Sequence, residues 1–397
     1  MPHRIVVLGA GYSGAIAAGR LAKRLHREEV AVTLVNAEPD FVERVRMHQV
    51  ATGQELKHRP FSEMFAGSGV EVKIAKVTSV DVDRKTVSVA GSSGVETLSF
   101  DTLVYALGSG WNAQGVPGTA EHAYELASRP GAMRLRERLS RLEAGQPVAV
   151  VGGGLTSVEA ATEIAEARPD LDVSLVVRGA LGDWLSAKGQ GHLRKVLGKL
   201  RITVHEHADV THVAADAVAT ADGRSIPAAV TVWTTGFAVH PIAAATTLDV
   251  TATGQIVVDE TMRSVSHPDV YAVGDAAYAM GVGDKPLRMS CASGTPMAWQ
   301  AADSIAARLT GGKLPQAHLK YFNQCISLGR KEGLIQYVTG DDRSVNAVLT
   351  GRFAAVYKEL VCKGAAWGVA NPTLGMPTRR RHVLRDAAAG SAVEALA

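Results

Sequence analysis

Cysteine is scarce in this chain of 397 residues, and the spacing of its cysteines excludes two common kinds of site. Cys291, Cys325 and Cys362 form no CxxC pair, and no histidine pair stands near them. An odd number of widely spaced cysteines argues against a disulfide framework and against a structural zinc site. We therefore expect buried, unreactive thiols and no bound metal.

Long apolar runs, a cleavable leader and a large net charge are also absent. No stretch approaches the roughly 18 apolar residues of a membrane span, and the start MPHRIVVLG lacks the apolar core and cleavage site of a secretory signal. The net charge of +3 is small for this length and provides no argument for nucleic-acid binding. These absences predict a cytoplasmic protein without a nucleic-acid partner.

Glycine, by contrast, is abundant, and 40 glycines fit a fold with many tight turns between strands and helices. The length predicts two or three domains. A strand–helix–strand unit begins at residue 4 and a second one at residue 148, and short alternating strands occupy residues 70 to 105. The pattern is typical of an α/β protein.

The first unit carries the spacing G-x-G-x-x-G within RIVVLGAGYSGAIAA. Its first glycine permits a tight turn, its second lets the backbone approach a pyrophosphate, and its third lets helix and strand pack closely. The free N–H groups at the helix start then face the phosphates. The next strand ends at Asn36, whose amide oxygen can accept one bond from a ribose hydroxyl. The turn residues predicted to contact a dinucleotide are Gly9, Gly11, Tyr12, Ser13 and Gly14.

The second unit, VAVVGGGLTSVEAA, repeats the pattern with serine in place of the third glycine. Its second strand ends at Arg178, which either attracts the 2′-phosphate of NADPH or is simply solvated at a strand end. The residues predicted for this second site are Gly152, Gly154, Thr156, Ser157, Glu159 and Arg178. Two such sites predict one cofactor that stays bound and one that comes and goes, as hydride transfer requires.

The motifs together resemble those of flavoproteins with two dinucleotide-binding domains, the superfamily of glutathione-reductase-like enzymes. The markers occur in the order GAGYSG, TLVYALGS, GGGLTSVE, TVWTTGF and VYAVGDAA. The resemblance covers the chain to about residue 370 and implies FAD at the first site and NADH or NADPH at the second. It places Asp275 on the ribityl chain of FAD and Val77 beside its adenine. Further cofactor contacts implied are Arg44, Gly108, Gly236 and Gly274.

The resemblance implies an α/β fold with two Rossmann-like domains, in which the NAD(P) domain interrupts the FAD domain, and a small C-terminal α+β domain. The expected ranges are 1–115 and 241–310 for the FAD-binding domain, 116–240 for the NAD(P)H-binding domain, 311–370 for a C-terminal interface domain, and 371–397 for a flexible tail.

Within this superfamily, the branch is indicated by a missing motif and by two segments that are present. The region FVERVRMHQVATGQE lacks the CxxxxC of the disulfide reductases, so a dithiol mechanism is excluded. This region and LRMSCASGTPMAWQAADSIA are similar to type II NADH dehydrogenases, the single-subunit NADH:quinone oxidoreductases, and above all to their actinobacterial group. That similarity implies that Arg46, His48 and Gln49 lie where the electron acceptor arrives, with His48 as candidate proton donor near neutral pH. The alternative is that the three residues only hold a helix against FAD.

The C-terminal region departs from type II dehydrogenases, which end in membrane-docking helices. The segment RFAAVYKELVCKGAAWGVA has an apolar stripe with nearby lysines, and it either lies on an anionic membrane surface or packs on the body or on a second subunit of a homodimer. The sequence therefore predicts an NAD(P)H dehydrogenase that reduces a quinone-like small molecule. The alternatives are a soluble biosynthetic flavin oxidoreductase or oxidase, a ferredoxin- or rubredoxin-type reductase, and an NAD(P)H redox sensor.

Overall fold

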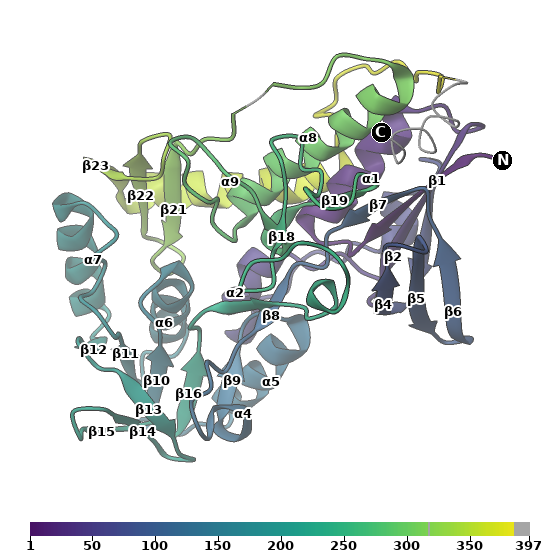
Figure 1. Ribbon diagram of the computed structural model, residues 1–397. Helices are drawn as coiled ribbons and strands as arrows, with labels where there is room; N and C mark the ends of the chain where they lie inside the picture. Colours follow the sequence, from purple (N-terminus) through teal and green to yellow (C-terminus); the bar gives the residue numbers. More distant parts are fainter. Residues whose placement is uncertain (317, 385–397) are drawn as a thin grey trace.

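The computed structural model describes residues 1–316 and 318–384, and its first domain is built on a five-stranded parallel sheet (Figure 1). The strand order is β19-β7-β1-β2-β3, with bounds β1 His3–Leu8, β2 Val30–Asn36, β3 Val70–Ile74, β7 Thr102–Tyr105 and β19 Val270–Ala272. Because β19 follows the second domain in the sequence, the first domain is made of two separate stretches of chain. The predicted α/β class, with one dinucleotide-type domain interrupting another, is confirmed.

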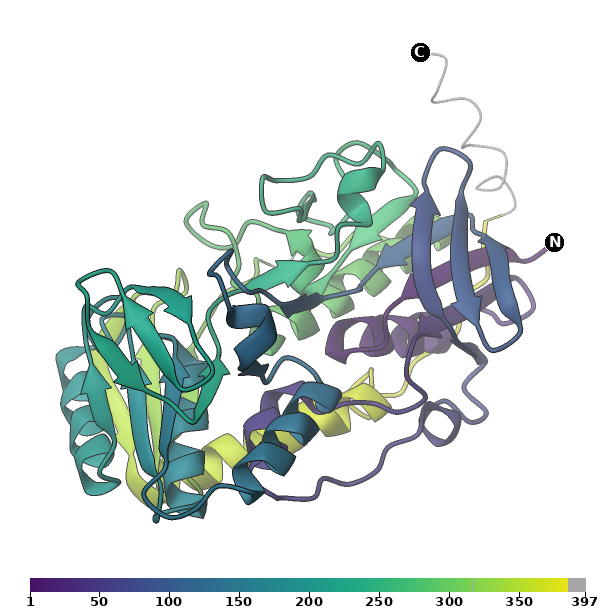
Figure 2. The same cartoon turned by 90° about the horizontal axis from the view of Figure 1, so that it is seen from below.

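Both faces of this sheet are covered, as the continuous apolar run in β1 requires. Helices α1 (Tyr12–Arg24) and α8 (Cys291–Thr310) pack side by side on one face. A small antiparallel sheet of β4 (Lys76–Asp81), β5 (Thr86–Gly91) and β6 (Gly94–Ser99) lies on the opposite side (Figure 2). This three-layer arrangement fixes the glycine turn between β1 and α1 at the carboxyl edge of the sheet.

The second domain repeats the parallel sheet with the order β12-β11-β10-β16-β9. Its bounds are β9 Ala123–Glu125, β10 Pro147–Val151, β11 Asp172–Val176, β12 Thr203–His205 and β16 Val230–Trp233. Alternate residues face opposite sides, as in any strand. Val148 and Val150 pack in one cluster with helices α5 (Arg129–Ser140), α6 (Leu155–Ala167) and α7 (Ala187–Lys199). Ala149 and Val151 instead pack against the antiparallel strands β13 (Val210–Val213), β14 (Ala217–Thr220) and β15 (Ser225–Pro227).

Two short strands connect the domains. The chain leaves the first domain through β8 (Ser109–Trp111) and returns through β17 (Phe237–Val239), and the two strands pair antiparallel. This pairing brings Trp111 and Phe237 together between the two domains.

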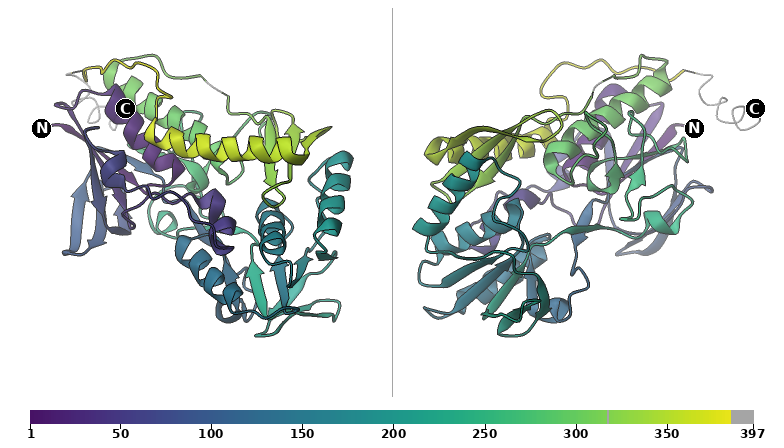
Figure 3. Two further views of the ribbon diagram at one scale, coloured as in Figure 1. Left: turned by 180° about the vertical axis from the view of Figure 1, so that it is seen from behind. Right: turned by 60° about the vertical axis from the view of Figure 1, so that its left-hand side comes forward.

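The C-terminal part consists of the antiparallel strands β21 (Asn323–Ser327), β22 (Gly333–Val338) and β23 (Ser344–Thr350) and the helix α9 (Gly351–Ala370). Helix α9 runs from this sheet to α1, so it spans both domains (Figure 3). Among the described residues, no helix combines the length and apolarity that crossing a bilayer requires.

The chain beyond α9 is held against the first domain as far as the structure describes it. Arg20 donates to the carbonyl oxygen of Pro372 at 3.0 Å, and the backbone N–H of Arg381 donates to the carbonyl oxygen of Arg24 at 2.9 Å. The sequence predicted a mobile tail from residue 371, whereas residues 371–384 bind the ends of α1 and α8. The prediction was wrong for residues 371–384 because an Arg- and Gly-rich composition does not reveal contacts with distant helices. The rest of the predicted tail, 385–397, lies outside the described residues.

Candidate functional site

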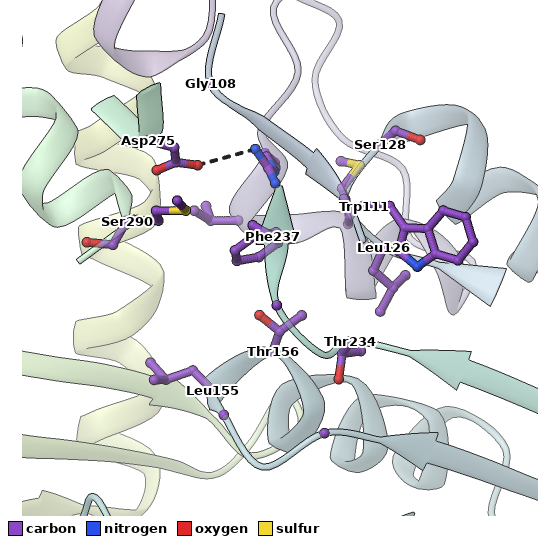
Figure 4. Close-up of a pocket in the computed structure, with 18 of the residues that line it drawn as sticks. Gly108, Trp111, Leu126, Ser128, Leu155, Thr156, Thr234, Phe237, Asp275 and Ser290 are labelled. Atoms are coloured by element: carbon purple, nitrogen blue, oxygen red, sulfur yellow. Dashed lines mark ion pairs between the residues drawn. The ribbon is translucent and has the colours of Figure 1, made fainter. Parts of the chain in front are cut away.

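A single cavity of about 2020 Å³ extends from the first glycine turn to the second and reaches α9. Its walls come from the carboxyl edges of both parallel sheets, from β8 and β17, and from the start of α8 (Figure 4). In that view Phe237 lies between Asp275 and Ser290 of the first domain and Leu155 and Thr156 of the second. Ligand sites of open α/β sheets are expected at this edge.

Glycine stands at the three positions of the first turn for different reasons. A Cβ on Gly9 would overlap the carbonyl oxygen of Ala106, and a Cβ on Gly14 would overlap the carbonyl oxygen of Gly9. A Cβ on Gly11 would meet nothing, although Gly11 is the N-cap of α1 and lines the cavity. The fold therefore requires Gly9 and Gly14, while only something bound in the cavity would require Gly11. Tyr12 and Ser13 also line the cavity.

Asn36 lines the cavity but already uses both ends of its amide. Its Oδ1 accepts from the backbone N–H of Ala10 at 2.9 Å, and its Nδ2 donates to the carbonyl oxygen of Glu38 at 2.8 Å. Asn36 therefore holds the turn, and a bond from a ribose hydroxyl to its amide oxygen stays a prediction. The neighbouring Glu38 lines the cavity and is exposed, so its carboxylate is the better placed acceptor. The predicted Val77 is buried in β4 and is not part of the cavity wall, which its neighbour Lys76 joins.

Asp275 follows β19 and lines the cavity. Its Oδ2 accepts from Ser109 Oγ at 2.6 Å and lies 3.6 Å from Arg44 Nη1. Arg44 also stacks on the ring of Phe237. The left-handed φ of +71° at Gly274 brings the loop against Ser13, where a Cβ would be only 2.7 Å from the hydroxyl. Of the other predicted glycines, Gly108 and Gly236 also line the cavity.

The second turn repeats the logic of the first. Gly154 is the N-cap of α6, it lines the cavity, and a Cβ on it would meet nothing. Ser157 stands in for the third glycine: it is buried, and its side chain would lie 3.3 Å from a Cβ on Gly152. Its hydroxyl donates to the carbonyl oxygen of Gly154 at 2.6 Å, which satisfies the polar group. Thr156 lines the cavity beside Gly154.

Arg178 follows β11 and lines the same cavity as the second turn. It is exposed, and among the described residues it forms no ion pair and no side-chain hydrogen bond. In the same domain, the Glu206 carboxylate pairs instead with Arg194 at 2.7 Å and accepts from the backbone N–H of Leu181 at 2.6 Å. Arg178 is thus an uncommitted cation at the mouth of the second site. Trp184 touches the second turn through a hydrogen bond to the carbonyl oxygen of Gly153 at 3.0 Å.

A buried ion pair joins the second turn to α9. Lys358 Nζ lies 3.0 Å from Glu159 Oε1, and both residues line the cavity. Burial opposes the charge on Lys358, but the surrounding groups, with the Glu159 carboxylate first among them, together outweigh burial and raise the pKa of Lys358. Burial likewise opposes ionisation of Glu159, but the charge of Lys358 and a bond from the Ser327 N–H lower the pKa of Glu159. Lys358 was not predicted as a site residue, because a lysine on an amphipathic helix usually lies on its solvent-exposed face.

His48 lies in α2 (Met47–Ala51), lines the cavity, and is buried. Burial lowers its pKa to about 4, although the nearby Glu159 opposes that shift. The imidazole is therefore neutral at pH 7, which corrects the expectation that His48 changes charge near neutral pH. Its Nε2 has no hydrogen-bond partner among the described residues.

The other two predicted acceptor-side residues are buried outside the cavity wall. Arg46 is buried between Glu43, at 3.2 Å, and Glu359 of α9, at 2.8 Å. Gln49 is buried beside it and accepts from Arg46 at 3.4 Å. Neither residue is part of the cavity wall, so the geometry favours the alternative in which they hold α2 in place.

The three cysteines, far apart in sequence, meet near Lys358. Cys291 and Cys325 line the cavity, and Lys358 donates to the carbonyl oxygen of Cys325 at 3.0 Å. Burial raises the pKa of all three thiols, and that of Cys325 reaches about 11. They are therefore protonated at neutral pH and poor nucleophiles. Within the described part of the chain, no group of three His, Cys, Asp or Glu side chains gathers to hold a metal.

The fold and cavity define an oxidoreductase scaffold with two dinucleotide sites. Residues 3–306 match the family described as pyridine nucleotide-disulphide oxidoreductase, and the chain belongs to that family. The membership confirms the predicted superfamily.

Several known proteins are similar over most of their length. An NADH dehydrogenase-like protein of Mycobacterium tuberculosis is 27% identical, over 86% of this chain and 89% of its own. The demethylphylloquinone reductase of Synechocystis is 24% identical, over 89% of this chain and 92% of its own. The solved structure of NDH2 from Plasmodium falciparum in complex with NADH superposes with a TM-score of 0.77 at 15% identity and covers 95% of this chain and 99% of that one, which shows a shared fold.

Proposed function

We propose that the protein is an FAD-dependent oxidoreductase that takes hydride from NAD(P)H and passes two electrons to a quinone-like acceptor. One observation carries the proposal: two glycine turns, each with an N-cap glycine that the fold does not itself require, open onto one cavity. The names of the relatives, NADH dehydrogenase-like protein and demethylphylloquinone reductase, support both the donor and the acceptor class.

The residues of the first turn fit FAD. The start of α1 offers N–H groups and its positive dipole end to the pyrophosphate, Glu38 is placed to accept from the adenosine ribose, and Asp275 from the ribityl hydroxyls. When bound, FAD supplies a carrier that accepts a hydride and releases two electrons. The start of α6 offers the same N–H groups to the pyrophosphate of NAD(P)H.

The acceptor side is formed by the Glu159–Lys358 pair and by His48. The Lys358 ammonium can donate a hydrogen bond to an acceptor oxygen that enters beside Asn323, Cys325 and Val361. Reduction puts negative charge on that oxygen, and a nearby cation stabilises this charge most strongly in a cavity with little water. The Lys358 ammonium also carries a proton that it can give to that oxygen.

The two open glycines provide the test. Gly11→Val places side-chain bulk where the FAD pyrophosphate would lie, and Gly154→Val does the same for NAD(P)H, while neither Cβ meets the protein. We expect Gly11→Val to purify folded but colourless. We expect Gly154→Val to purify yellow and to resist bleaching by NADH or NADPH in an anaerobic titration.

Each variant is the control for the other, because both carry the same substitution at the same position of equivalent turns. Circular dichroism confirms that each is folded. A Gly11→Val protein with its full complement of FAD would contradict the first site, and normal bleaching of Gly154→Val would contradict the second.

The acceptor entrance opens beside an uncovered apolar face of α9, which supports contact with a membrane that holds a lipid-tailed quinone. Phe353 is 82% exposed and Leu360 is 62% exposed, so this stripe is not packed on the body of the protein. Its other members are Val356, Tyr357, Val361 and Trp367. Arg352 and Lys363 flank it, and the single acid of α9, Glu359, is turned toward Arg46. An apolar face bordered by cations fits an anionic lipid surface.

A further inference from the structure

A buried carboxyl group next to the site has no part in the function described so far. Glu163 lies one turn beyond Glu159 on α6 and is 2% exposed. Its Oε1 accepts from Gln54 Nε2, and its Oε2 has no hydrogen-bond partner among the described residues. A buried carboxyl oxygen without a hydrogen-bond partner lowers the stability of the fold, and an apolar side chain at this position would be less destabilising. A destabilising carboxyl group at this position indicates a functional role for Glu163.

Glu163 is the middle member of a row of three glutamates on one face of α6. Residues spaced by four and by three on a helix lie on the same side, with Cβ atoms about 5–6 Å apart. Glu159 marks the cavity end of the row, where it pairs with Lys358. Glu166 marks the outer end, is only half-buried, and accepts from the backbone N–H of Arg330. Gln54, the hydrogen-bond partner of Glu163, is also half-buried.

The charges around Glu163 leave it able to take up and release a proton near neutral pH. Burial raises its pKa to about 7, with Glu166 and Glu159 acting in the same direction and Arg330 opposing them. Of the other elements packed against this part of α6, α2 contributes His48, which is neutral at pH 7. The turn between β21 and β22 contributes Arg330, which is exposed.

The proposed reaction needs a proton at this place. A quinone that becomes a quinol gains two electrons and two protons, whereas NAD(P)H delivers two electrons with one proton as hydride. One further proton must therefore come from solvent in every turnover. The Lys358 ammonium lies on the cavity wall, Glu159 is buried, and the Lys358 side chain is only 16% exposed. Once FAD and the acceptor fill the cavity, a proton taken from this pair must therefore be replaced through the protein.

We propose that Glu163 is a proton relay that reloads the Glu159–Lys358 pair from solvent during reduction of the acceptor. The Glu163 carboxyl group gives its proton toward Glu159, its neighbour one turn away on the same face of α6. It then takes a proton from solvent at the end marked by Gln54 and Glu166, so its own state is unchanged over the cycle. The inference rests on the proposed function, because only an acceptor that binds protons uses this route.

Glu163→Gln tests the relay, because it keeps the shape and the bond to Gln54 but cannot carry a proton. We expect its turnover with a water-soluble benzoquinone to fall on the order of 10-fold or more. Turnover with ferricyanide, which accepts electrons without protons, should stay at the wild-type rate, as should anaerobic bleaching of FAD by NAD(P)H. Glu163→Asp, which keeps a carboxyl group, should recover part of the quinone rate.

The pH profile separates a relay from a structural role. Wild-type quinone turnover should decline above about pH 7, where Glu163 loses its proton, while ferricyanide turnover should not. In Glu163→Gln this decline should disappear. Thr162→Val is the matched control, because it removes a buried hydrogen-bonding group from the same helix without removing a titratable one, and it should keep the wild-type profile.

Three outcomes would overturn the relay. An unchanged quinone rate in Glu163→Gln overturns it alone, and a parallel loss of quinone and ferricyanide turnover assigns Glu163 a structural role. A wild-type protein that reduces ferricyanide but no quinone overturns the proposed function, and the relay with it.

Discussion

At the scale of single residues, we predict that Arg178 discriminates between the two nicotinamide coenzymes. It lines the second site, it is exposed, and nothing among the described residues pairs with it. Arg178→Ala should lower kcat/KM for NADPH by about 10- to 100-fold, the equivalent of about 1.5–3 kcal/mol for a hydrogen bond to a charged group. The value for NADH should change much less, because NADH carries no 2′-phosphate.

The control for Arg178 is Arg141→Ala, which removes one cation from the same domain. Arg141 is exposed, pairs with Glu137 and lies outside the cavity. Equal losses for both coenzymes in Arg178→Ala would mean that the arginine acts only through the general charge of the domain.

His48 makes the fold sensitive to acid. Its pKa falls from 6.5 in the unfolded chain to about 4 in the folded protein. A lowered pKa contributes stability that is complete above the unfolded value and is lost as the pH falls toward the folded value. Between pH 7.5 and pH 5, His48 should therefore remove about 2 kcal/mol from the free energy of unfolding. His48→Gln should lose correspondingly less stability than wild type in urea unfolding over this interval.

The exposed His58 provides the comparison for this measurement, because it pairs with Asp40 at the surface. His58→Gln should follow the wild-type pH dependence. The same acid sensitivity in His48→Gln as in wild type would show that His48 is not held neutral by burial.

Helix α9 has two opposite faces with different tasks. Ala354, Cys362 and Ala366 are buried, whereas Phe353 and Leu360 are exposed. Leu360→Glu should reduce co-flotation with anionic phospholipid vesicles and turnover of a lipid-tailed quinone, by several-fold. Turnover of a soluble quinone should persist, because the change leaves the cavity wall intact.

Val95→Glu is the matched control for this helix, since Val95 is an exposed apolar residue on β6. It should float like wild type. If neither wild type nor Leu360→Glu binds vesicles and wild type is a dimer that Leu360→Glu dissociates, the apolar face is a subunit interface and the membrane proposal is wrong.

Across the whole molecule, Asp303 ties the first helix of the chain to the last described segment. It accepts from Arg20 at 2.7 Å and from Arg24 at 3.1 Å, and Arg20 also donates to Pro372. Asp303→Asn leaves two neighbouring guanidinium groups without a carboxylate. The ion pairs of Asp303 with Arg20 and Arg24 are largely but not fully buried. The loss of unfolding free energy should therefore be about 2–3 kcal/mol, somewhat below that of a fully buried pair.

Asp222→Asn, which weakens the exposed pair with Arg224, should lower the free energy of unfolding far less than Asp303→Asn in the same experiment. Equal losses for the two variants would show that the Asp303 cluster contributes no more than an ordinary surface ion pair.

Features set by neighbouring residues could be predicted from the sequence, whereas features set by contacts between distant segments could not. Gly9, Gly11 and Gly14 act within one turn, so their spacing alone predicted a strand–turn–helix at a cavity. The pKa of His48 was misjudged, because the burial that lowers it comes from segments distant in sequence. The hydrogen bond from Ala10 to Asn36 was missed for the same reason. Lys358 was missed for the same reason, since its partner Glu159 lies 199 positions earlier (358 − 159).

Local chemistry along the chain thus specified the two glycine turns, the alternating strands and helices, and the family, because each depends on residues a few positions apart. Packing of distant segments specified which charges are paired, which thiols are buried and which glutamate lies beside the site. The position of α9 across both domains places Lys358 on the cavity wall and leaves the apolar face of the helix exposed. Such relations depend on the free energy of the whole folded chain, which no short stretch of sequence contains.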